Sequence, residues 1–411
     1  MARPSREENA KLKREALLAA GLKVVATHGY AKASVSRIAA ASGVSLGSLY
    51  SYFPSHQDLL DELLPAEGER LLAHIQKAAR GTEPFFERER LAFSAFYDFV
   101  ARRPSLLRVL VEAEIAAPGS YVRLMDTIRA RYYRALERAV ANGEIRASDD
   151  HFLQVATHVL TGTRGIIAIG FSDREGNRFL KPGKLPDWVA DTYLKFVRHG
   201  LDDRKPFSWG KSDFAPPLSP VAPDTRLRLM LSAAQAMQAK GFAGTTVADI
   251  VQGAGVAVGT FYIHFQSREE LFDALLTYAR AEMLSHVQHE ITDSRSIAEV
   301  ECRGFRALTS YLIANPWHLR VEMEASLWVP KSYLKHFFEI ADRYTATLSR
   351  FHRAGELLEF REEELPVVSL ILMAPRRYLA TRLIGSETTV EQRHRIFDDY
   401  ARLIRFGLSR R

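Results

Sequence analysis

The feature that most constrains this chain is a segment that occurs twice. Residues 29–64 return as residues 241–276, a shift of 241 − 29 = 212 residues without a gap, and 14 of the 36 positions are identical. The same shift continues beyond this segment, where Glu112 matches Glu324. A repeat of this length indicates two copies of one structural unit. The chain is therefore expected to fold as two similar halves rather than around a single core.

The connector between the copies is rich in proline. Residues 202–223 contain five of the chain's 17 prolines, a density typical of an extended spacer with no core of its own. With this connector in place, the sequence divides into five predicted segments. They are a first head at 1–64, a first body at 65–201, the linker at 202–223, a second head at 224–276 and a second body at 277–411.

Composition narrows the kinds of protein this chain can be. The formal charge of +7 favours an anionic partner. Cys302 is the only cysteine, which excludes a disulfide framework and a multi-cysteine metal site and fits a reducing compartment. The N-terminus has no apolar signal core. The most apolar stretch, Leu153–Phe171, contains His158 and Arg164, which argues against a membrane span. We expect a cytoplasmic protein that does not enter a membrane.

Apolar residues recur at helical spacing almost throughout, and alternation of period two is scarce. The predicted fold class is all-α. In the first copy Ser34 and Ser45 are typical N-caps of two short helices, and Gly43 suits a left-handed residue between them. Thr246 and Gly255 repeat these signals in the second copy. Two short helices joined by a glycine turn and packed on a longer helix form a helix-turn-helix. An ordinary helical hairpin that binds no DNA has the same pattern.

The stretches Gly29–Phe53 and Gly241–Phe265 resemble the N-terminal motif of the TetR family of bacterial transcriptional regulators. The resemblance implies two tandem TetR-like units, each with a three-helix DNA-binding domain and a larger helical domain for ligand binding and dimerisation. Ordinary members carry one unit per chain and pair through the last two helices of each unit. Here the resemblance implies a monomer that acts as an internal pseudo-dimer. The four helices of the predicted bundle are 151–171, 187–201, 366–384 and 390–408.

Double-stranded operator DNA is the partner that the resemblance implies. Helix N-termini can hold phosphates, and the outward side of the third helix can reach base edges. The candidate DNA contacts are Ser34, Ser45, Leu46, Gly47, Ser48, Tyr50, Tyr52 and His56 in the first copy and Thr246, Ala257, Val258, Gly259, Thr260, Tyr262, His264 and Arg268 in the second. Two alternatives stay open: packing of Tyr50 and Tyr262 on the first helix, and close approach of another helix to Gly47 and Gly259.

The two predicted reading helices differ in sequence. Ser45 and Leu46 of the first copy correspond to Ala257 and Val258 of the second. A homodimer presents two identical readers and so favours palindromes, whereas a fused pair is free of that symmetry. We therefore expect an asymmetric operator. In many family members a lysine at the start of the fourth helix touches phosphate, and His56 and Arg268 stand at that point, so a weaker anchor is expected in the first copy.

A small-molecule effector is the second partner that the resemblance implies. The candidate ligand contacts are Phe96, Tyr121, Tyr132 and Arg164 in the first body and Trp317, Trp328, Tyr333, Phe337 and Arg376 in the second. Aromatic residues at helical spacing also fit plain core packing. Each of the two matched arginines, Arg164 and Arg376, needs a partner if it is buried. The predicted partner is Glu112 or Glu324 in a structural salt bridge, and the alternative is an acidic ligand.

Two other classes of protein compete with a regulator. The first is an enzyme, but the 13 histidines are scattered and there is no Gly-rich phosphate loop and no G-x-S-x-G motif. We predict no catalytic residue, no metal site and no cofactor. The second is a helical adaptor or ligand-binding protein that has lost DNA binding. Steep salt dependence of binding to DNA would distinguish a regulator from both.

Overall fold

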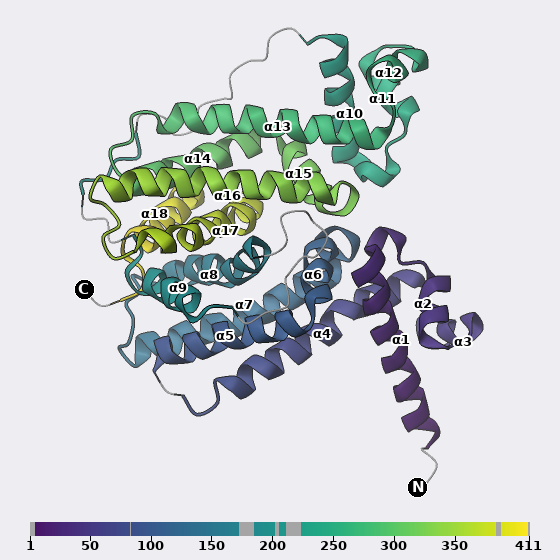
Figure 1. Ribbon diagram of the computed structural model, residues 1–411, viewed down its shortest axis with the longest axis horizontal. Helices are drawn as coiled ribbons and strands as arrows, with labels where there is room; N and C mark the ends of the chain where they lie inside the picture. The colour runs from purple at the N-terminus through teal and green to yellow at the C-terminus, as the bar shows by residue number, and fades with distance from the viewer. Residues whose placement is uncertain are drawn as a thin grey trace. The chain divides into compact units, whose positions relative to one another are not determined.

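In the computed structural model, residues 5–82, 84–171, 185–201, 205–210, 223–383 and 388–409 are described, and these residues form helices and connecting segments without a strand. The all-α prediction is confirmed (Figure 1). The first copy contains α1 (Arg6–His28), η1 (Tyr30–Lys32), α2 (Val35–Ser42), α3 (Leu46–Tyr50), α4 (His56–Ala78), α5 (Phe85–Arg102), α6 (Pro104–Ala116), α7 (Pro118–Ala141), α8 (Asp150–Gly170) and α9 (Asp187–His199).

The second copy repeats this order of helices. It contains α10 (Thr225–Gly244), α11 (Val247–Ala254), α12 (Val258–His264), α13 (Arg268–Ile291), α14 (Ile297–Ala314), α15 (Pro316–Trp328), α16 (Pro330–Arg353), η2 (Glu362–Glu364), α17 (Leu365–Leu383) and α18 (Val390–Phe406). Gly241 has a positive φ of 70° inside α10, at the point where Gly29 ends α1 in the first copy. The tandem arrangement expected from the sequence is therefore present at the level of individual helices.

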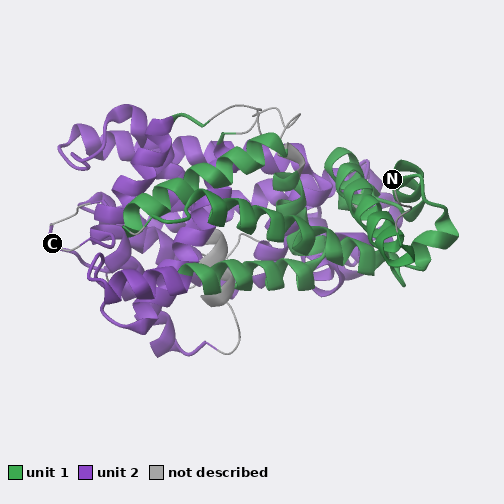
Figure 2. Ribbon diagram, turned by 90° about the horizontal axis from the view of Figure 1, so that it is seen from below, with its two compact units in different colours: residues 1–132, 171–186 green, residues 133–170, 187–411 purple. Residues whose placement is uncertain are grey.

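The chain forms two compact units whose boundary differs from the sequence repeat (Figure 2). Unit 1 comprises residues 1–132 and 171–186, and unit 2 comprises residues 133–170 and 187–411. The helices α8 and α9 belong to the first copy in sequence but to unit 2 in space, because α8 packs along α17 and α18 and α9 packs on α17. The predicted four-helix bundle, made of the last two helices of each copy, thus lies within unit 2.

Backbone hydrogen bonds at the end of the bundle show its internal symmetry. The N–H of Leu201 donates to the carbonyl of Ile404 at 2.8 Å, and the N–H of Leu408 donates to the carbonyl of Val197 at 2.9 Å. The sequences of the two copies match here at a shift of 207, so Leu408 corresponds to Leu201 and Ile404 to Val197. Each copy therefore donates and accepts the same bond, as the two chains of a symmetric dimer do.

Close packing and ion pairs join the two copies further along the bundle. A Cβ at Gly170 would collide with the side chain of Leu370, so the helices approach closely there. The ammonium of Lys195 on α9 lies 2.7 Å from a carboxylate oxygen of Glu364, which is 3% exposed. The hydroxyl of Thr192 donates to the other oxygen at 3.2 Å. The bundle is thus fixed by specific polar contacts as well as by apolar burial.

The helix α8 is long and apolar enough in composition to cross a membrane. However, 72% of its most apolar window is buried inside the protein, against α17 and α18. It is therefore the core helix of the bundle.

The described part of the linker, Lys205–Gly210, is docked on the second copy. Three arginines hold it: Arg303 donates to the carbonyl of Ser208 at 2.9 Å, Arg405 donates to that of Lys205 at 2.9 Å, and Arg306 donates to that of Trp209. The indole N–H of Trp209 donates to Asp398 at 3.1 Å. The spacer predicted from the prolines is therefore anchored on α14 and α18 over these six residues.

Candidate nucleic-acid interface and ligand pocket

The first head has the geometry of a helix-turn-helix. Ser34 caps α2 by accepting the Arg37 N–H at 3.4 Å, and Ser45 caps α3 by accepting the Ser48 N–H at 3.3 Å. Gly43 has φ 70° and ψ 11° in the turn between these helices, a left-handed conformation that costs other residues free energy. All three capping and turn predictions are confirmed. The hydroxyls of Ser34 and Ser45 remain at exposed helix N-termini.

The predicted reading residues of both heads lie on exposed surfaces. Tyr50 is 48% exposed and Tyr262 is 59% exposed, so both side chains have surface available to a partner. Gly47 and Gly259 are exposed, and a Cβ on either would meet no atom within 4 Å. Close approach of another helix to them is therefore wrong. The other predicted contacts on or just before α3 and α12 are exposed or half-buried, namely Ser45, Leu46, Ser48, Tyr52, Ala257, Val258, Thr260 and His264.

One exposed apolar residue of the second head was not predicted from the sequence. Ile263 on α12 is 80% exposed, beside Val258 at 52%. The equivalent of Ile263 in the first copy is Ser51, at 263 − 212 = 51. An aliphatic side chain can contact the methyl group of thymine in the major groove. The signal that would have identified Ile263 is its position between the two predicted contacts Tyr262 and His264.

The start of α11 in the second head is occupied by a carboxylate. Asp249 accepts the N–H of Thr246 at 2.7 Å and the hydroxyl of Thr246 at 2.6 Å, and its other oxygen lies 2.7 Å from the ammonium of Lys240. Lys240 and Thr246 hold the pKa of this carboxyl well below its ordinary value. Thr246 is exposed as predicted, but the Asp249 charge disfavours a phosphate at this helix N-terminus.

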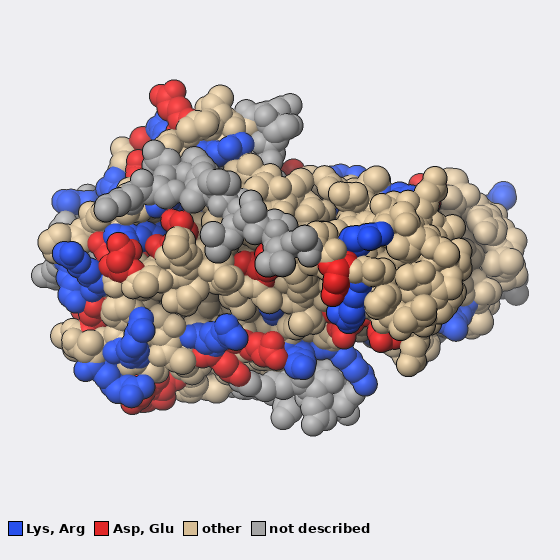
Figure 3. Space-filling view, turned by 90° about the horizontal axis from the view of Figure 1, so that it is seen from above, with Lys and Arg blue, Asp and Glu red and all other residues tan. Residues whose placement is uncertain are grey.

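The two heads therefore differ in charge at equivalent places. The first copy has Arg37 where the second has Asp249, since 249 − 212 = 37. Between Gly29 and Phe53 the Asp, Glu, Lys and Arg residues are Lys32 and Arg37, whereas between Gly241 and Phe265 there is Asp249 alone. In the view of Figure 3, Lys and Arg are interspersed with Asp and Glu over the left part, and fewer charged side chains are seen toward the right-hand end.

His56 and Arg268, at the start of the fourth helix of each copy, are used inside the protein. The Nε2 of His56 lies 2.6 Å from the carbonyl oxygen of Ala33. The guanidinium of Arg268 donates to the carbonyls of Phe242 and Thr245 and stacks over the ring of Phe242. Both residues hold α4 or α13 against the loop that precedes the second helix of the head. Their contacts fix the shape of each head.

Each head is tied to its own body by a buried glutamate. Glu112 on α6 accepts the backbone N–H of Tyr30 at 2.7 Å and the Nε–H of Arg108 at 2.7 Å. Burial raises the pKa of the Glu112 carboxyl, although Arg108 opposes this. In the second copy Glu324 on α15 accepts the N–H of Phe242 at 2.6 Å and pairs with Arg320. We call these two clusters the head–body joints.

The joints bear on one prediction. The two carboxylates that were expected to pair with Arg164 and Arg376 are each held by an arginine one helical turn earlier, Arg108 for Glu112 and Arg320 for Glu324. The other partner of each carboxylate is a backbone N–H of the head, and the sequence offered no signal for it. Arg164 is half-buried on α8. The side chain of Arg376 lies outside the described residues.

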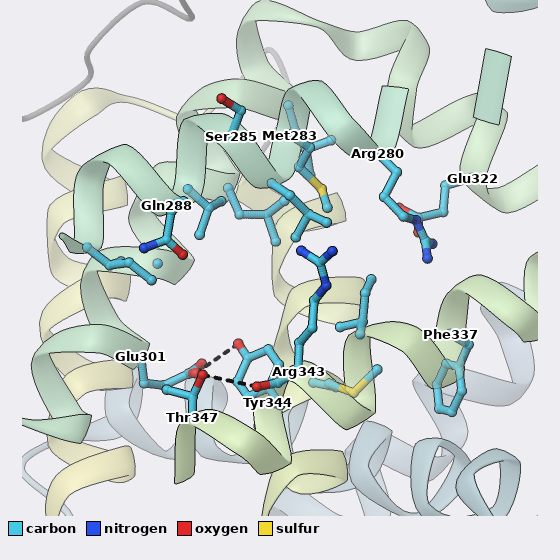
Figure 4. Close-up of a pocket in the computed structure, with 18 of the residues that line it drawn as sticks. Arg280, Met283, Ser285, Gln288, Glu301, Glu322, Phe337, Arg343, Tyr344 and Thr347 are labelled. Atoms are coloured by element: carbon cyan, nitrogen blue, oxygen red, sulfur yellow. Dashed lines mark hydrogen bonds and ion pairs between the residues drawn. The ribbon is translucent and has the colours of Figure 1, made fainter. Parts of the chain in front are cut away.

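A cavity of about 570 Å³ lies inside the second body (Figure 4). Its walls come from α13, α14, α15 and α16, with Ile166 of α8 and Met373 of α17. Most of the lining is aliphatic, for example Met283, Leu308 and Leu312. A cavity of this size and character is typical of a site for a small apolar molecule. Since Ile166 belongs to the first copy, the wall includes helices of the bundle from both copies.

Some polar groups on the cavity wall have hydrogen-bond partners within the protein, and others do not. Glu301 accepts hydroxyl groups from Tyr344 at 2.9 Å and from Tyr400 at 2.7 Å, so both of its oxygens are satisfied. Arg280 on α13 has a side chain only 7% exposed, and its Nη2 donates to Glu322 at 3.0 Å. The Nε and Nη1 atoms of Arg280 are buried and have no hydrogen-bond partner. Burial lowers the pKa of this guanidinium, and Glu322 opposes the change.

His318 lies beside this ion pair. It is 1% exposed, its Nε2 is 3.9 Å from Glu322, and its Nδ1 is buried without a partner. Burial lowers the pKa of His318 to about 4, against a weaker opposing effect of Glu322. His318 is therefore a neutral imidazole at physiological pH.

The predicted ligand contacts are distributed between this cavity and other places. Tyr333 and Phe337 line it. Trp317 stacks near His318 outside the lining, and the ring of Trp328 lies 5.1 Å from that of Phe242 at the head–body joint. In the first body, Phe96 and Tyr121 are buried, and Tyr132 is buried with its hydroxyl donating to Glu89 at 3.1 Å. Arg280, Met283 and Arg343, which line the cavity, were missed because a residue on a buried helical stripe cannot be assigned to core or cavity from spacing.

Two short helices joined by a glycine turn, with α3 and α12 exposed, occur twice on this chain, which is the arrangement of a helix-turn-helix. The family described as "Bacterial regulatory proteins, tetR family" matches residues 17–63 and 229–275, which are parts of the two heads. The chain therefore carries the N-terminal DNA-binding domain of the TetR family twice. It is a DNA-binding regulator of transcription.

Known relatives cover part of the chain, as expected for a duplicated unit. The HTH-type transcriptional repressor KstR of Mycobacterium tuberculosis is 26% identical over 147 residues, which are 36% of this chain and 67% of KstR. The nucleoid occlusion factor SlmA of Escherichia coli is 26% identical over 160 residues, 38% of this chain and 80% of SlmA. The solved structure of the fatty acid degradation regulator FadR from Bacillus halodurans aligns at 19% identity with a TM-score of 0.39, covering 44% of this chain and 96% of FadR. The curated relatives are regulators and not enzymes.

Proposed function

We propose that this chain is a cytoplasmic repressor that binds an asymmetric operator as a monomer, with its two heads serving as unlike halves of one reader. The observation that carries the proposal is the reciprocal pair of hydrogen bonds, Leu201 to Ile404 and Leu408 to Val197, by which one chain builds both sides of a dimer-like bundle. A chain that satisfies its own bundle needs no second copy to present two heads.

The asymmetry of the operator follows from the two reading surfaces. The first head offers Ser45, Leu46 and Ser48 with a cationic neighbour, Arg37. The second offers Val258 and Ile263 with Asp249 at the preceding helix. Hydroxyl groups donate to and accept from base edges, whereas aliphatic groups favour thymine methyls. The second half-site is therefore proposed to be richer in thymine and less dependent on phosphate contacts.

The route from effector to DNA is proposed to run along α13 and α15 of the second copy. The helix α15 carries Glu322, which lines the cavity, and Glu324, which holds the N–H of Phe242 in the head, only two residues apart. The helix α13 begins with Arg268 against the head and passes Arg280 at the cavity. An effector that prefers one position of these helices over another would shift the head with it.

A mobility-shift titration with the DNA upstream of the protein's own gene tests this proposal. We expect retention that weakens steeply with salt, and at least a tenfold loss in Tyr50→Ala and in Tyr262→Ala, while Val122→Ala on the exposed face of α7 leaves binding unchanged. Substitution of each base pair is expected to give unequal costs in the two half-sites. Light scattering is expected to give the mass of one chain.

Three results would contradict the proposal. Failure to retain upstream DNA at low salt would remove the regulatory function. A perfect palindrome with equal costs in both half-sites would remove the asymmetric operator. An obligate particle of two chains would remove the internal pseudo-dimer.

A further inference from the structure

We propose that the second body binds an elongated apolar effector that ends in a carboxylate or a similar anion, that Arg280 receives this anion, and that the first body has no such site. This inference rests on the proposed function, since it names the chemistry of the effector and the copy that senses it.

The first argument is the state of the polar groups at the cavity. Arg280 is nine-tenths buried, yet its Nε–H and Nη1 groups have no partner. Buried donors without an acceptor cost free energy, and an anion in the cavity would supply the acceptor that these two groups lack. The acidic group on the opposite side, Glu301, has both oxygens filled by tyrosine hydroxyls. Arg280 therefore has donors to spare, which favours an anion over a cation at this point of the wall.

A second cation reaches the same space. Figure 4 shows the Arg343 side chain, from α16, extending into the open centre of the cavity, while Arg280 lies at its edge beside Glu322. Among the described residues, no carboxylate within salt-bridge distance of Arg343 is recorded. Arg343 therefore adds to the cavity a guanidinium that is not held by a carboxylate of the described residues, in a lining that is mostly aliphatic. Such a combination suits a molecule with a long apolar part and one anionic end.

The second argument is a comparison with the first copy. At 280 − 212 = 68 the first copy has Gly68, and a Cβ placed there would collide with Leu124. The first carbon of a side chain at this position would thus meet a leucine side chain. His318 and Glu322 correspond to Leu106 and Leu110, which cannot take part in an ion pair. The polar cluster is specific to the second copy.

The consequence is that only one of the two bodies, the second, binds the effector. In a dimer of identical chains, both bodies present the same pocket and bind the same effector. Here the divergence at positions 68 and 280 assigns anion binding to one body of the pair. The expected stoichiometry is one effector per chain.

Isothermal titration of the full chain with three matched C12 probes, below their micellar concentrations, tests the inference. The probes are dodecanoic acid, dodecanol and dodecyltrimethylammonium. We expect the acid to bind once per chain and about 10- to 100-fold more tightly than the alcohol, the range of one charge-assisted contact, with the ammonium probe weakest. In Arg280→Met the acid is expected to fall to the affinity of the alcohol, whose own affinity stays unchanged. Arg280→Lys is expected to restore part of the difference.

The matched control is Arg131→Met, which removes the exposed first-copy equivalent of Arg343 and is expected to change nothing. Thermal melting by circular dichroism checks that Arg280→Met is folded, and Arg280→Lys provides the second test if it is not. The inference is overturned by equal affinities of acid and alcohol, by an Arg280→Met protein that keeps the preference, by two acids per chain, or by no binding of any probe. The upstream-DNA assay on the same preparation separates the two proposals. DNA retention without preference for the acid refutes the inference alone, and acid preference without DNA retention refutes the regulatory function alone.

Discussion

Mild acid is expected to destabilise the second body through His318. Its burial lowers the pKa to about 4, from an ordinary value of 6.5 that applies to the unfolded chain. A base with a depressed folded pKa contributes stability that is present above the unfolded value and is lost as the pH falls toward the folded value. The affected window is therefore between pH 6.5 and about 4.

The magnitude follows from the difference between the two pKa values. pH 5 lies about 1.5 pH units below the pKa of the unfolded chain. Protonation of this histidine therefore stabilises the unfolded chain by about 2 kcal/mol at pH 5, whereas folded His318 is still almost entirely neutral. Near pH 4 the loss approaches about 3 kcal/mol. Full burial of the imidazole means that solvent screening does not reduce this figure appreciably.

The variant His318→Leu isolates this contribution. Leucine is the residue that the first copy carries at the matched position, Leu106, since 318 − 212 = 106. We expect the free energy of unfolding of the wild type to fall by about 2 kcal/mol more than that of the variant between pH 7 and pH 5. Urea unfolding followed by tryptophan fluorescence measures this, because Trp317 and Trp328 lie at the two ends of α15.

The control is His289→Gln on the exposed face of α13, which is expected to keep the wild-type pH dependence. Identical pH profiles for wild type and His318→Leu would refute the reasoning. So would an NMR titration of His318 with a midpoint near 6.5, because the imidazole would then be solvated and not buried.

Two further predictions concern the second head and the bundle. Asp249→Asn removes a carboxylate from the start of α11 and is expected to tighten binding to operator DNA several-fold at low salt, an effect that fades as salt rises; unchanged affinity would place this helix away from phosphate. Burial acts to raise the pKa of Glu364, but Lys195 and the Arg361 N–H outweigh it, so the pKa lies below its ordinary value of 4.5. Its stabilising effect is present above pH 4.5 and is lost as the pH falls through the lowered value. Lys195→Met is expected to cost about 1.5 kcal/mol at pH 7 and to flatten this acid loss, as measured by urea unfolding from pH 7 to pH 3.

The sequence predicted the parts of this protein that depend on local rules. N-caps such as Ser34 and Ser45 and the turn residue Gly43 act through their own neighbours, so their residue types are enough. The bundle was predicted from the family resemblance, and the reciprocal bonds of Leu201 and Leu408 bear it out.

Contacts between residues far apart in the sequence could not be predicted from such local rules. Glu112 matched Glu324 at a fixed shift, but its partner proved to be the backbone N–H of Tyr30, which every residue type offers equally. Arg280 has a sequence signal that does not depend on spacing. It occupies a stripe with Leu276, Ala279 and Met283 on α13, where a charged residue is unexpected, and the other copy has a glycine there. Differences between duplicates can thus be as informative as identities.

The bundle formed by α8, α9, α17 and α18 has a consequence for concentration dependence. In a dimer of separate chains, such a seam forms only when two molecules meet. Here Lys195 of one copy and Glu364 of the other meet within a single chain. Dilution therefore does not separate these two faces, because the covalent chain keeps their effective concentration high.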